Sequence, residues 1–378
     1  MTPKICILLY KQGTMKQSFL YCTKYGWLIL VFMLVMGNHA VAQLDPVKAD
    51  SFLYFIKANP LRSAVYITRN DTAIARLNEN KLMPLASTVT MLVAIEFAQQ
   101  STHEMINENT YVPVADIEKF YIPFIDSAAY NTWLDKAKAN NEIKNGTVKL
   151  VDIARGMIIY GCYTNADYLM DILGFDAVKD NLALLKLKQH TAIYPFAGSL
   201  FTFHVPKKSS EDKLLKSLAK YSDKKYSMEA YYNHQDLKQD SSFKETFSPE
   251  RFTPKLQKMW NDNLPSSTTK EYVMVAQALN NREVLDEDAF FPIAEILEYP
   301  MEKREFQKLY KHFGAKTGKT PFIFTRVIYF TQKDGTRIES AIFFNGLSPA
   351  EEKKLEDWQP AFEAQFLSDP VFRARVKF

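Results

Sequence analysis

Three short stretches of this 378-residue chain carry the side chains best suited to chemistry. Ser87 stands at the start of a long apolar run, Cys162 lies in the middle of the chain, and the tripeptide 316–318 reads Lys-Thr-Gly. A serine hydroxyl attacks a carbonyl carbon once a base takes its proton, and a helix N-terminus stabilises the negative charge that develops. Simpler interpretations stay open, because Ser87 can also cap a helix and Cys162 can be a small buried apolar residue rather than a reactive thiol.

The order of these stretches resembles the penicillin-recognising serine hydrolases, which comprise the class A β-lactamases and the penicillin-binding D,D-peptidases. Their signature reads S-x-x-K, then S-x-N, then K-T-G. Residues 83–88 (Met-Pro-Leu-Ala-Ser-Thr) resemble the approach to the family's nucleophile, and residues 154–174 resemble its helix pair around S-x-N. The resemblance extends from about residue 50 to residue 350.

The resemblance implies a role for each matched position. Ser87 takes the place of the nucleophile that forms an acyl-enzyme, and Lys316, Thr317 and Gly318 match K-T-G in full. In this family the K-T-G strand orients a substrate carboxylate, and the substrates are β-lactams or peptidoglycan stem peptides. No metal and no cofactor is implied.

The chain departs from the family at the residues that move protons. Thr90 replaces the lysine of S-x-x-K, and Gly161 and Tyr163 replace the serine and asparagine of S-x-N. A threonine hydroxyl is no proton acceptor near neutral pH. Asn165 comes two positions late, and a helix turns it away by about 200°. Residues 173–200 also lack the E-x-x-L-N stretch that supplies a glutamate in class A enzymes.

Two hypotheses about function follow. The first is a serine hydrolase weakened by its lost lysine, since loss of a proton acceptor costs ~10²–10⁴ in rate. The second is a catalytically inactive binding protein that uses the retained cleft for cell-wall peptides, a hypothesis that predicts an intact K-T-G beside lost proton carriers. A covalent penicillin adduct at Ser87 separates the two.

Charge and composition exclude other classes. The chain has 47 basic and 43 acidic residues, and four lysines within residues 1–42, which hold no acidic residue, account for the whole excess. The remainder is neutral, which argues against binding to nucleic acid. There is no H-x-x-x-H or C-x-x-C spacing for a metal and no glycine-rich phosphate loop.

The N-terminus has the pattern of a secretory signal peptide. Residues 27–36 are apolar, lysines precede them, and Ala40-Val41-Ala42 forms a small-x-small cleavage site before Gln43. Ten apolar residues are too few for a spanning helix, which needs about 20. We therefore expect export to the periplasm or the exterior without a stable membrane anchor, with Met15 as an alternative start. Cleavage leaves Cys162 as the remaining cysteine, so no internal disulfide is expected.

Periodicity and turn residues predict an α+β fold within one domain, residues 43–378. Hairpins are expected around Asn70-Asp71 and around 333–335, a helix apolar on every face from about 84 to 98, and flanking helices at 47–57 and 349–367. Residues 100–312 read as a central all-α lobe. The resemblance predicts a β-lactamase/transpeptidase-like antiparallel sheet, built from the N- and C-terminal segments. No function is evident for the helical stretch 205–265.

Overall fold

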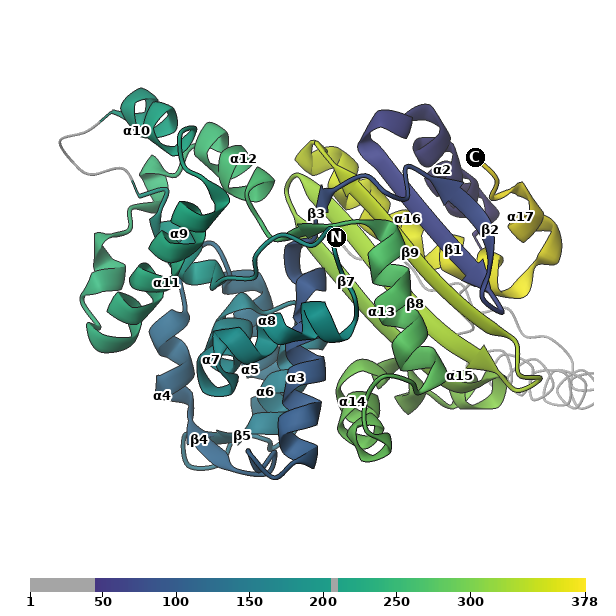
Figure 1. Ribbon diagram of the computed structural model, residues 1–378, viewed down its shortest axis with the longest axis horizontal. Coiled ribbons are helices and arrows are strands. Elements are labelled where there is room, and N and C mark those ends of the chain that lie inside the picture. The colour runs from purple at the N-terminus through teal and green to yellow at the C-terminus, as the bar shows by residue number, and fades with distance from the viewer. Residues whose placement is uncertain (1–44, 205–209) are drawn as a thin grey trace, which may run out of the picture. The chain divides into compact units, whose positions relative to one another are not determined.

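The strands that open and close the chain join in one antiparallel sheet. The computed structural model describes residues 45–204 and 210–378, so the predicted signal peptide at 1–42 and its cleavage site lie outside the described residues (Figure 1). The strand order is β2-β1-β9-β8-β7. The strands are β1 (Ser63–Arg69), β2 (Thr72–Leu77), β7 (Tyr310–Thr320), β8 (Ile323–Gln332) and β9 (Arg337–Asn345). The predicted sheet is confirmed, and β7, which carries the K-T-G tripeptide, is one of its two edge strands.

Turn residues explain both predicted hairpins. Asn70 and Asp71 have positive φ angles of 47° and 65° between β1 and β2, the conformation that a two-residue hairpin turn requires and that these side chains tolerate. Gly335 has a φ of 89° between β8 and β9. β1 then pairs with β9, with Val65 opposite Ile342, and so the first and last strands lie side by side.

Helices from both ends of the chain cover one face of the sheet. These are α2 (Pro46–Ala58), α16 (Pro349–Ser368) and α17 (Pro370–Arg375), shown in purple and yellow in Figure 1. Phe52 of α2 packs on Phe344 of β9 and on Phe362 of α16, with ring centroids 5.6 Å and 4.7 Å apart. Aromatic burial therefore ties the first and last elements to the sheet.

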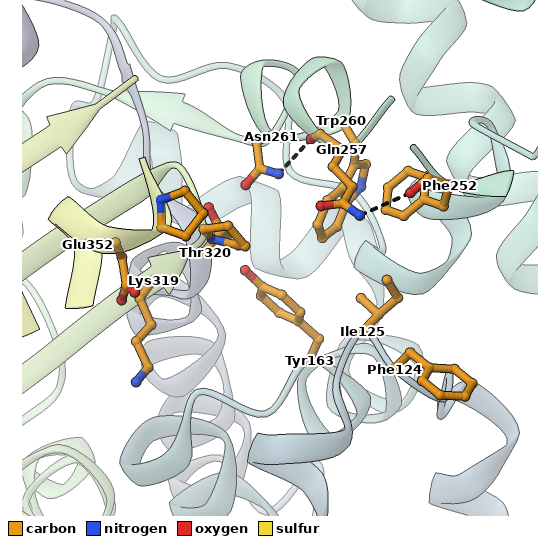
Figure 2. Close-up of a pocket in the computed structure, with 12 residues that line it drawn as sticks. Phe124, Ile125, Tyr163, Phe252, Gln257, Trp260, Asn261, Lys319, Thr320 and Glu352 are labelled. Carbon is orange, nitrogen blue, oxygen red and sulfur yellow. Dashed lines mark hydrogen bonds between the residues drawn. The ribbon is translucent and has the colours of Figure 1, made fainter. Parts of the chain in front are cut away.

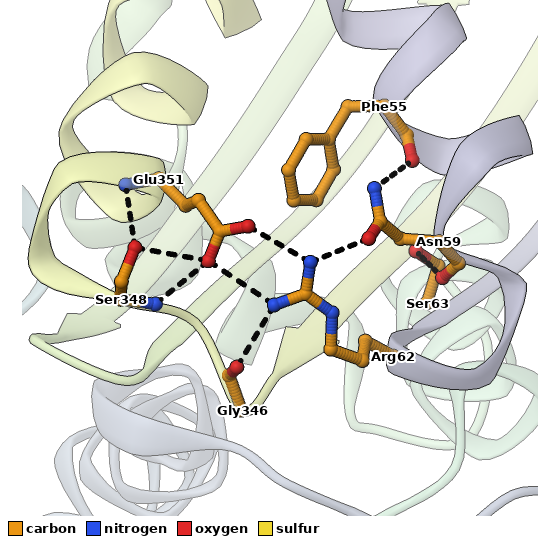
Figure 3. Close-up of polar contacts among 7 residues, drawn as sticks. All are labelled: Phe55, Asn59, Arg62, Ser63, Gly346, Ser348 and Glu351. Carbon is orange, nitrogen blue, oxygen red and sulfur yellow. Dashed lines mark hydrogen bonds and ion pairs between the residues drawn. The ribbon is translucent and has the colours of Figure 1, made fainter.

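A polar network fastens the same two ends (Figure 3). The Arg62 guanidinium donates to both Glu351 oxygens, at 2.8 and 3.1 Å, and to the Gly346 carbonyl at 3.0 Å. Glu351 also accepts from the backbone N–H of Ser348, whose hydroxyl in turn caps α16. These bonds hold the pKa of Glu351 at about 2, chiefly through the hydrogen bond from Arg62.

The opposite face of the sheet carries α13 (Thr269–Asn281), which packs on β8 and β9. Thr268 caps this helix by accepting from the Glu271 N–H at 3.1 Å. The helix α3 (Thr90–Thr102), preceded by the 3₁₀ turn η2 (Ala86–Val89), packs against helices of the predicted lobe. Nearly all residues of α3 are buried. The prediction of a central helix apolar on every face is confirmed for residues 90–98. The predicted start near residue 84 is wrong, because residues 83–84 form a short strand and 86–89 the 3₁₀ turn.

The predicted lobe at 100–312 is largely helical. Besides α13, its α-helices are α4 (Val114–Ile117), α5 (Ser127–Ala139), α6 (Leu150–Tyr160), α7 (Tyr163–Leu173), α8 (Phe175–Leu184), α9 (Phe196–Phe201), α10 (Glu211–Leu218), α11 (Asp223–Gln239), α12 (Pro254–Asp262), α14 (Phe290–Leu297) and α15 (Arg304–Leu309). Two small strand pairs interrupt it, because β4 (Tyr111–Pro113) pairs with β5 (Thr147–Lys149), and β6 (Ser266–Ser267) pairs with β3 (Met83–Pro84). Within 45–204 and 210–378, every helix falls short of the length and apolarity that crossing a bilayer requires.

Candidate active site

Ser87 lies in the turn η2, immediately before α3. Its side chain is 4% exposed, and its Oγ donates to the Thr317 carbonyl on β7 at 3.2 Å. Neither η2 nor α3 has a side-chain cap, so Ser87 is not a helix cap. The preceding Ala86 has a φ of 48°, a left-handed conformation that is strained for alanine. Such strain concentrates at functional sites.

Lys316 extends from β7 beneath the C-terminal end of α6. Its Nζ donates to the carbonyls of Ile158 and Met157 at 2.9 and 3.2 Å, where the helix dipole favours a cation. The side chain is 1% exposed. Burial is the main cause that lowers the pKa of Lys316, to about 7, and the nearby Arg326 charge makes a smaller contribution in the same direction. Lys316 therefore exchanges its proton near neutral pH.

Gly161 brings Ser87 and Lys316 to one place. It ends α6 with a φ of 73°, a left-handed conformation that suits glycine. A Cβ built on Gly161 would lie 3.1 Å from Ser87 Oγ and 3.8 Å from Lys316 Nζ. The first position of the degenerate S-x-N motif thus faces the serine directly. Its missing side chain leaves the backbone close against the hydroxyl.

Gly318 lets β7 lie against the serine turn. A Cβ at Gly318 would stand 2.5 Å from the Leu85 carbonyl oxygen and 2.7 Å from the Thr88 nitrogen, closer than real Cβ atoms approach. The Thr88 and Thr325 hydroxyls bond across this contact at 2.7 Å. The glycine of K-T-G is therefore a packing requirement that places the strand beside Ser87.

Thr317 is held by a pair of residues that sequence reasoning missed. Its Oγ1 accepts from Arg326 on β8 at 2.9 Å, while Arg326 makes two bonds to Glu363 of α16, at 2.6 and 2.9 Å. Because the Thr317 oxygen accepts here, its own hydrogen stays available to a ligand. The sequence did contain an indication of a role for Arg326, because this residue places a charge within the apolar run of β8.

Thr90 cannot replace the missing base. It is buried, and its hydroxyl donates to the Ser87 carbonyl at 2.7 Å, one helical turn back. In the described part of the chain, the hydroxyl of Ser87 bonds to a backbone carbonyl and to no carboxylate or imidazole. Lys316 is a titratable side chain close to Ser87, since its Nζ lies 3.8 Å from a Cβ built on Gly161.

Cys162 and Asn165 serve the start of α7. The Cys162 thiol donates to Asp126 at 3.2 Å, and burial raises its pKa well above the usual range, so it stays a thiol. Asp126 also accepts from the Thr164 N–H at 2.8 Å. Asn165 donates to the Ile153 carbonyl of α6 at 3.1 Å, so its amide is engaged in packing between α6 and α7. Cys162 is the small buried residue of the simpler interpretation.

A pocket of about 370 Å³ opens past the end of the K-T-G strand (Figure 2). Tyr163 lies in it and stacks on Phe196, with ring centroids 4.4 Å apart. Lys319 and Thr320 continue β7 into the same pocket. The complete lining is Phe124, Ile125, Tyr163, Phe252, Gln257, Trp260, Asn261, Lys319, Thr320, Pro321, Pro349 and Glu352. The helical stretch 205–265 therefore supplies one wall, a role that its sequence did not indicate.

Fold and site together define a protein built like the serine β-lactamases and penicillin-binding proteins. A family model described as "Beta-lactamase enzyme family" matches residues 50–357, and this chain belongs to that family. No curated protein matches the sequence.

Solved structures share the fold at low identity. A β-lactamase from Sphaerobacter thermophilus has 16% identity and a TM-score of 0.51, covering 86% of this chain and 100% of its own. A β-lactamase from Francisella tularensis has 13% identity and a TM-score of 0.51, covering 86% and 99%. A mutant of PBP-A, solved as an acyl-enzyme complex with penicillin G, has 10% identity and a TM-score of 0.50, covering 85% and 96%. At these identities the likeness concerns the fold.

Proposed function

We propose that this protein is a serine hydrolase that forms an acyl-enzyme at Ser87 on β-lactams or peptidoglycan stem peptides. One observation carries the proposal: Ser87 Oγ and Lys316 Nζ border the same space at Gly161. Membership of the β-lactamase family supports the reaction class. A nucleophile and a proton acceptor are the minimum that acyl transfer requires.

Lys316 takes the place of the absent motif lysine as the base. Near pH 7 a fraction of its amine is neutral, because burial lowers its pKa to about 7. That amine accepts the Ser87 proton, directly or through one water, as Oγ bonds to the substrate carbonyl carbon. The lysine then returns the proton to the leaving nitrogen as the C–N bond breaks. Water hydrolyses the ester by the reverse use of the same groups.

Thr317 binds the substrate carboxylate. Its hydroxyl hydrogen is available because its oxygen accepts from Arg326, and the guanidinium charge stands behind it. The oxygen that becomes negative during attack meets backbone N–H groups at the start of α3, where the helix dipole stabilises negative charge. In this assignment Lys316 moves the proton and Thr317 anchors the substrate.

A second candidate is a binding protein without catalysis. The environment of Ser87 supports this candidate. The side chain is 4% exposed, and its hydroxyl donates a hydrogen bond to the Thr317 carbonyl. Thr90 stands at the motif lysine position, and its hydroxyl donates a hydrogen bond to the Ser87 carbonyl. Such a protein would bind cell-wall peptides reversibly through Thr317 and Lys316.

Export completes the proposal. Residues 1–42 act as a signal peptide, with cleavage near Ala42 and Gln43 and delivery to the periplasm or beyond. Mass spectrometry of the purified secreted protein tests this, because cleavage leaves an N-terminus at residue 43. An N-terminus at residue 1 or 15 would overturn it.

A fluorescent penicillin tests the two functions. Acylation predicts a covalent adduct on the peptide that contains Ser87, absent from Ser87→Ala. Reversible binding without an adduct, weakened by Lys316→Ala, would instead support the binding protein. Neither adduct nor binding would contradict both.

A further inference from the structure

The side chain of Asp126 lies outside the helix pair α6 and α7 but bonds to the start of α7. Its Oδ2 accepts from the Thr164 N–H at 2.8 Å, from the Thr164 hydroxyl at 2.7 Å and from the Cys162 thiol at 3.2 Å. Its Oδ1 accepts from the Tyr163 N–H at 3.1 Å. A carboxylate at a helix N-terminus satisfies amides that have no partner within the helix, and the helix dipole favours its charge. Asp126 therefore caps α7 from a position 36 residues before Cys162.

Helix α7 depends on Asp126 for this cap because its own N-cap residue supplies none. Cys162 occupies the N-cap position, and within the described structure its side chain accepts from no amide of α7. The thiol bonds instead to Asp126 and, at 3.3 Å, to the Asn165 amide oxygen. Asp126 is 6% exposed, and the four groups that bond to it act as donors. Only an ionised carboxylate can accept from all four at once.

Asp126 is itself held by α5, which begins at the next residue. Its backbone carbonyl accepts from the Tyr130 N–H at 2.8 Å, a bond of the first turn of α5. Trp133 of α5 then donates to the Asp152 carbonyl of α6 at 3.3 Å. The carboxylate that caps α7 therefore belongs to a helix that is fastened to α6.

The α6–α7 link, which consists of Gly161 and Cys162, is the segment that these bonds fix. A Cβ built on Gly161 would lie 3.1 Å from Ser87 Oγ, and carbonyls in the last turn of α6 hold Lys316 Nζ. A link of two residues has little freedom once the helices on both sides are held. The bonds to Asp126 therefore act, through the link, on the surroundings of the serine and the lysine.

We propose that Asp126 is a positioning residue for acyl transfer at Ser87. Its carboxylate fixes the α6–α7 link, which keeps Gly161 against the serine and the end of α6 against Lys316. It acts through these backbone contacts and not on the substrate. The effect on rate rests on the proposed function, because a misplacement of about 1 Å slows a reaction by up to ~10²-fold only where that reaction occurs.

Asp126→Asn tests the proposal with little change of shape. Its NH₂ group would replace either the acceptor of the Tyr163 N–H or that of the Thr164 N–H, so a bond is lost in both orientations. Acylation by a fluorescent penicillin should be about tenfold slower or more, measured by stopped flow where circular dichroism shows a folded protein. The Kd of the initial penicillin complex should stay within about threefold of wild type, because the substrate contacts remain. A folded variant that acylates at the wild-type rate would overturn the proposal.

Glu339→Gln is the matched control. Glu339 is a buried carboxylate of β9 that accepts from the Thr68 hydroxyl at 2.6 Å and from the Asn280 amide. The same change from acid to amide should lower the melting temperature and keep the acylation rate within about threefold of wild type. If acylation slows as much as in Asp126→Asn, lost stability explains both variants and the proposal is wrong.

Thr164 offers a milder pair of variants, which decides the matter if Asp126→Asn does not fold. Thr164→Val removes one donor to the Asp126 carboxylate, and Thr164→Ser keeps that donor. Acylation should be about threefold slower or more with valine and should return to the wild-type rate with serine. Equal rates in these two variants would count against a positioning role.

Amide hydrogen exchange reports on the α6–α7 link without any reaction. In Asp126→Asn the Tyr163 and Thr164 amides should exchange about tenfold faster or more, because an acceptor is lost, whereas Glu339→Gln should leave them protected. Unchanged protection in Asp126→Asn would overturn the proposal. If no penicillin acylates the wild-type protein, the proposed function fails, and faster exchange confined to these amides would still support Asp126 as the residue that holds the link.

Discussion

Ser87 Oγ and Lys316 Nζ flank Gly161, at 3.1 and 3.8 Å from the position where a side chain would begin. Two sets of contacts produce this arrangement. Gly318 lets β7 lie against the serine turn, and the carbonyls at the end of α6 hold the lysine in place. A nucleophile and a titratable amine therefore meet although they belong to distant parts of the sequence.

Gly318→Ala should separate them. The added methyl group would stand 2.5 Å from the Leu85 carbonyl, so β7 must move away from η2. Overpacking of this kind costs ~1–3 kcal/mol, and we expect lower thermal stability and at least tenfold slower acylation at temperatures where the variant is folded.

Gly335→Ala is the control for that variant. Gly335 also has a positive φ, but its surroundings are open and it lies in the distant β8–β9 turn. It should lose stability and keep the wild-type acylation rate. If both variants acylate equally, the close approach at Gly318 does not position the site.

Thr90→Lys should restore a base at its family position. Thr90 follows Ser87 by one helical turn and bonds to its carbonyl. A proton acceptor there contributes ~10²–10⁴ in rate, so acylation by penicillin should rise sharply, as stopped-flow fluorescence can measure. The site is buried, and circular dichroism must first establish that the variant folds. A folded variant with no gain would mean that Lys316 already transfers the proton at the full rate, or that residue 90 does not reach the serine hydroxyl.

Thr317→Val should weaken binding more than turnover. It removes the hydroxyl hydrogen proposed for the substrate carboxylate and leaves Arg326 without one acceptor. We expect KM for a penicillin to rise about tenfold, with kcat within about threefold. A large fall in kcat at constant KM would instead assign Thr317 to the reacting groups.

Stability should fall in acid through Glu351. Its pKa is about 2 in the fold, below the usual value for glutamate, so the unfolded chain binds the proton more readily. The stabilisation is complete above the unfolded pKa of about 4.3 and is lost as the pH falls toward 2. Urea unfolding of wild type and Glu351→Gln should therefore differ at pH 7 and converge near pH 2. A difference that stays constant with pH would exclude this linkage.

Much of the fold was predictable because its signals are local. Asn70-Asp71 and Gly335 mark turns by their backbone preferences, and the all-round apolar pattern of α3 identifies a central helix. The family motifs brought Ser87 and Lys316 into one hypothesis, and the fold places them together. Local patterns and the order of the family motifs were therefore sufficient to predict the turns, the central helix and the association of Ser87 with Lys316.

The rest depends on contacts that no local pattern encodes. In the sequence, Gly161 appears only as the loss of the serine of S-x-N. In the structure, its left-handed backbone conformation places it next to the Ser87 hydroxyl. The pocket joins α7, α12, β7 and α16, so Trp260 and Glu352 become neighbours only through tertiary packing. Arg326 was visible as a charge in an apolar strand, but its partner Glu363 lies on another element.

The pH dependence of Ser87 acylation tests the central claim most directly. If neutral Lys316 accepts the proton, the rate should rise about tenfold per pH unit below pH 7 and level off above it, since the pKa of Lys316 is about 7. Lys316→Arg, which keeps the charge but cannot lose its proton, should then be inactive at every pH. A rate that falls above pH 7, or an active Lys316→Arg variant, would show that residue 316 acts as a fixed cation and would contradict the account.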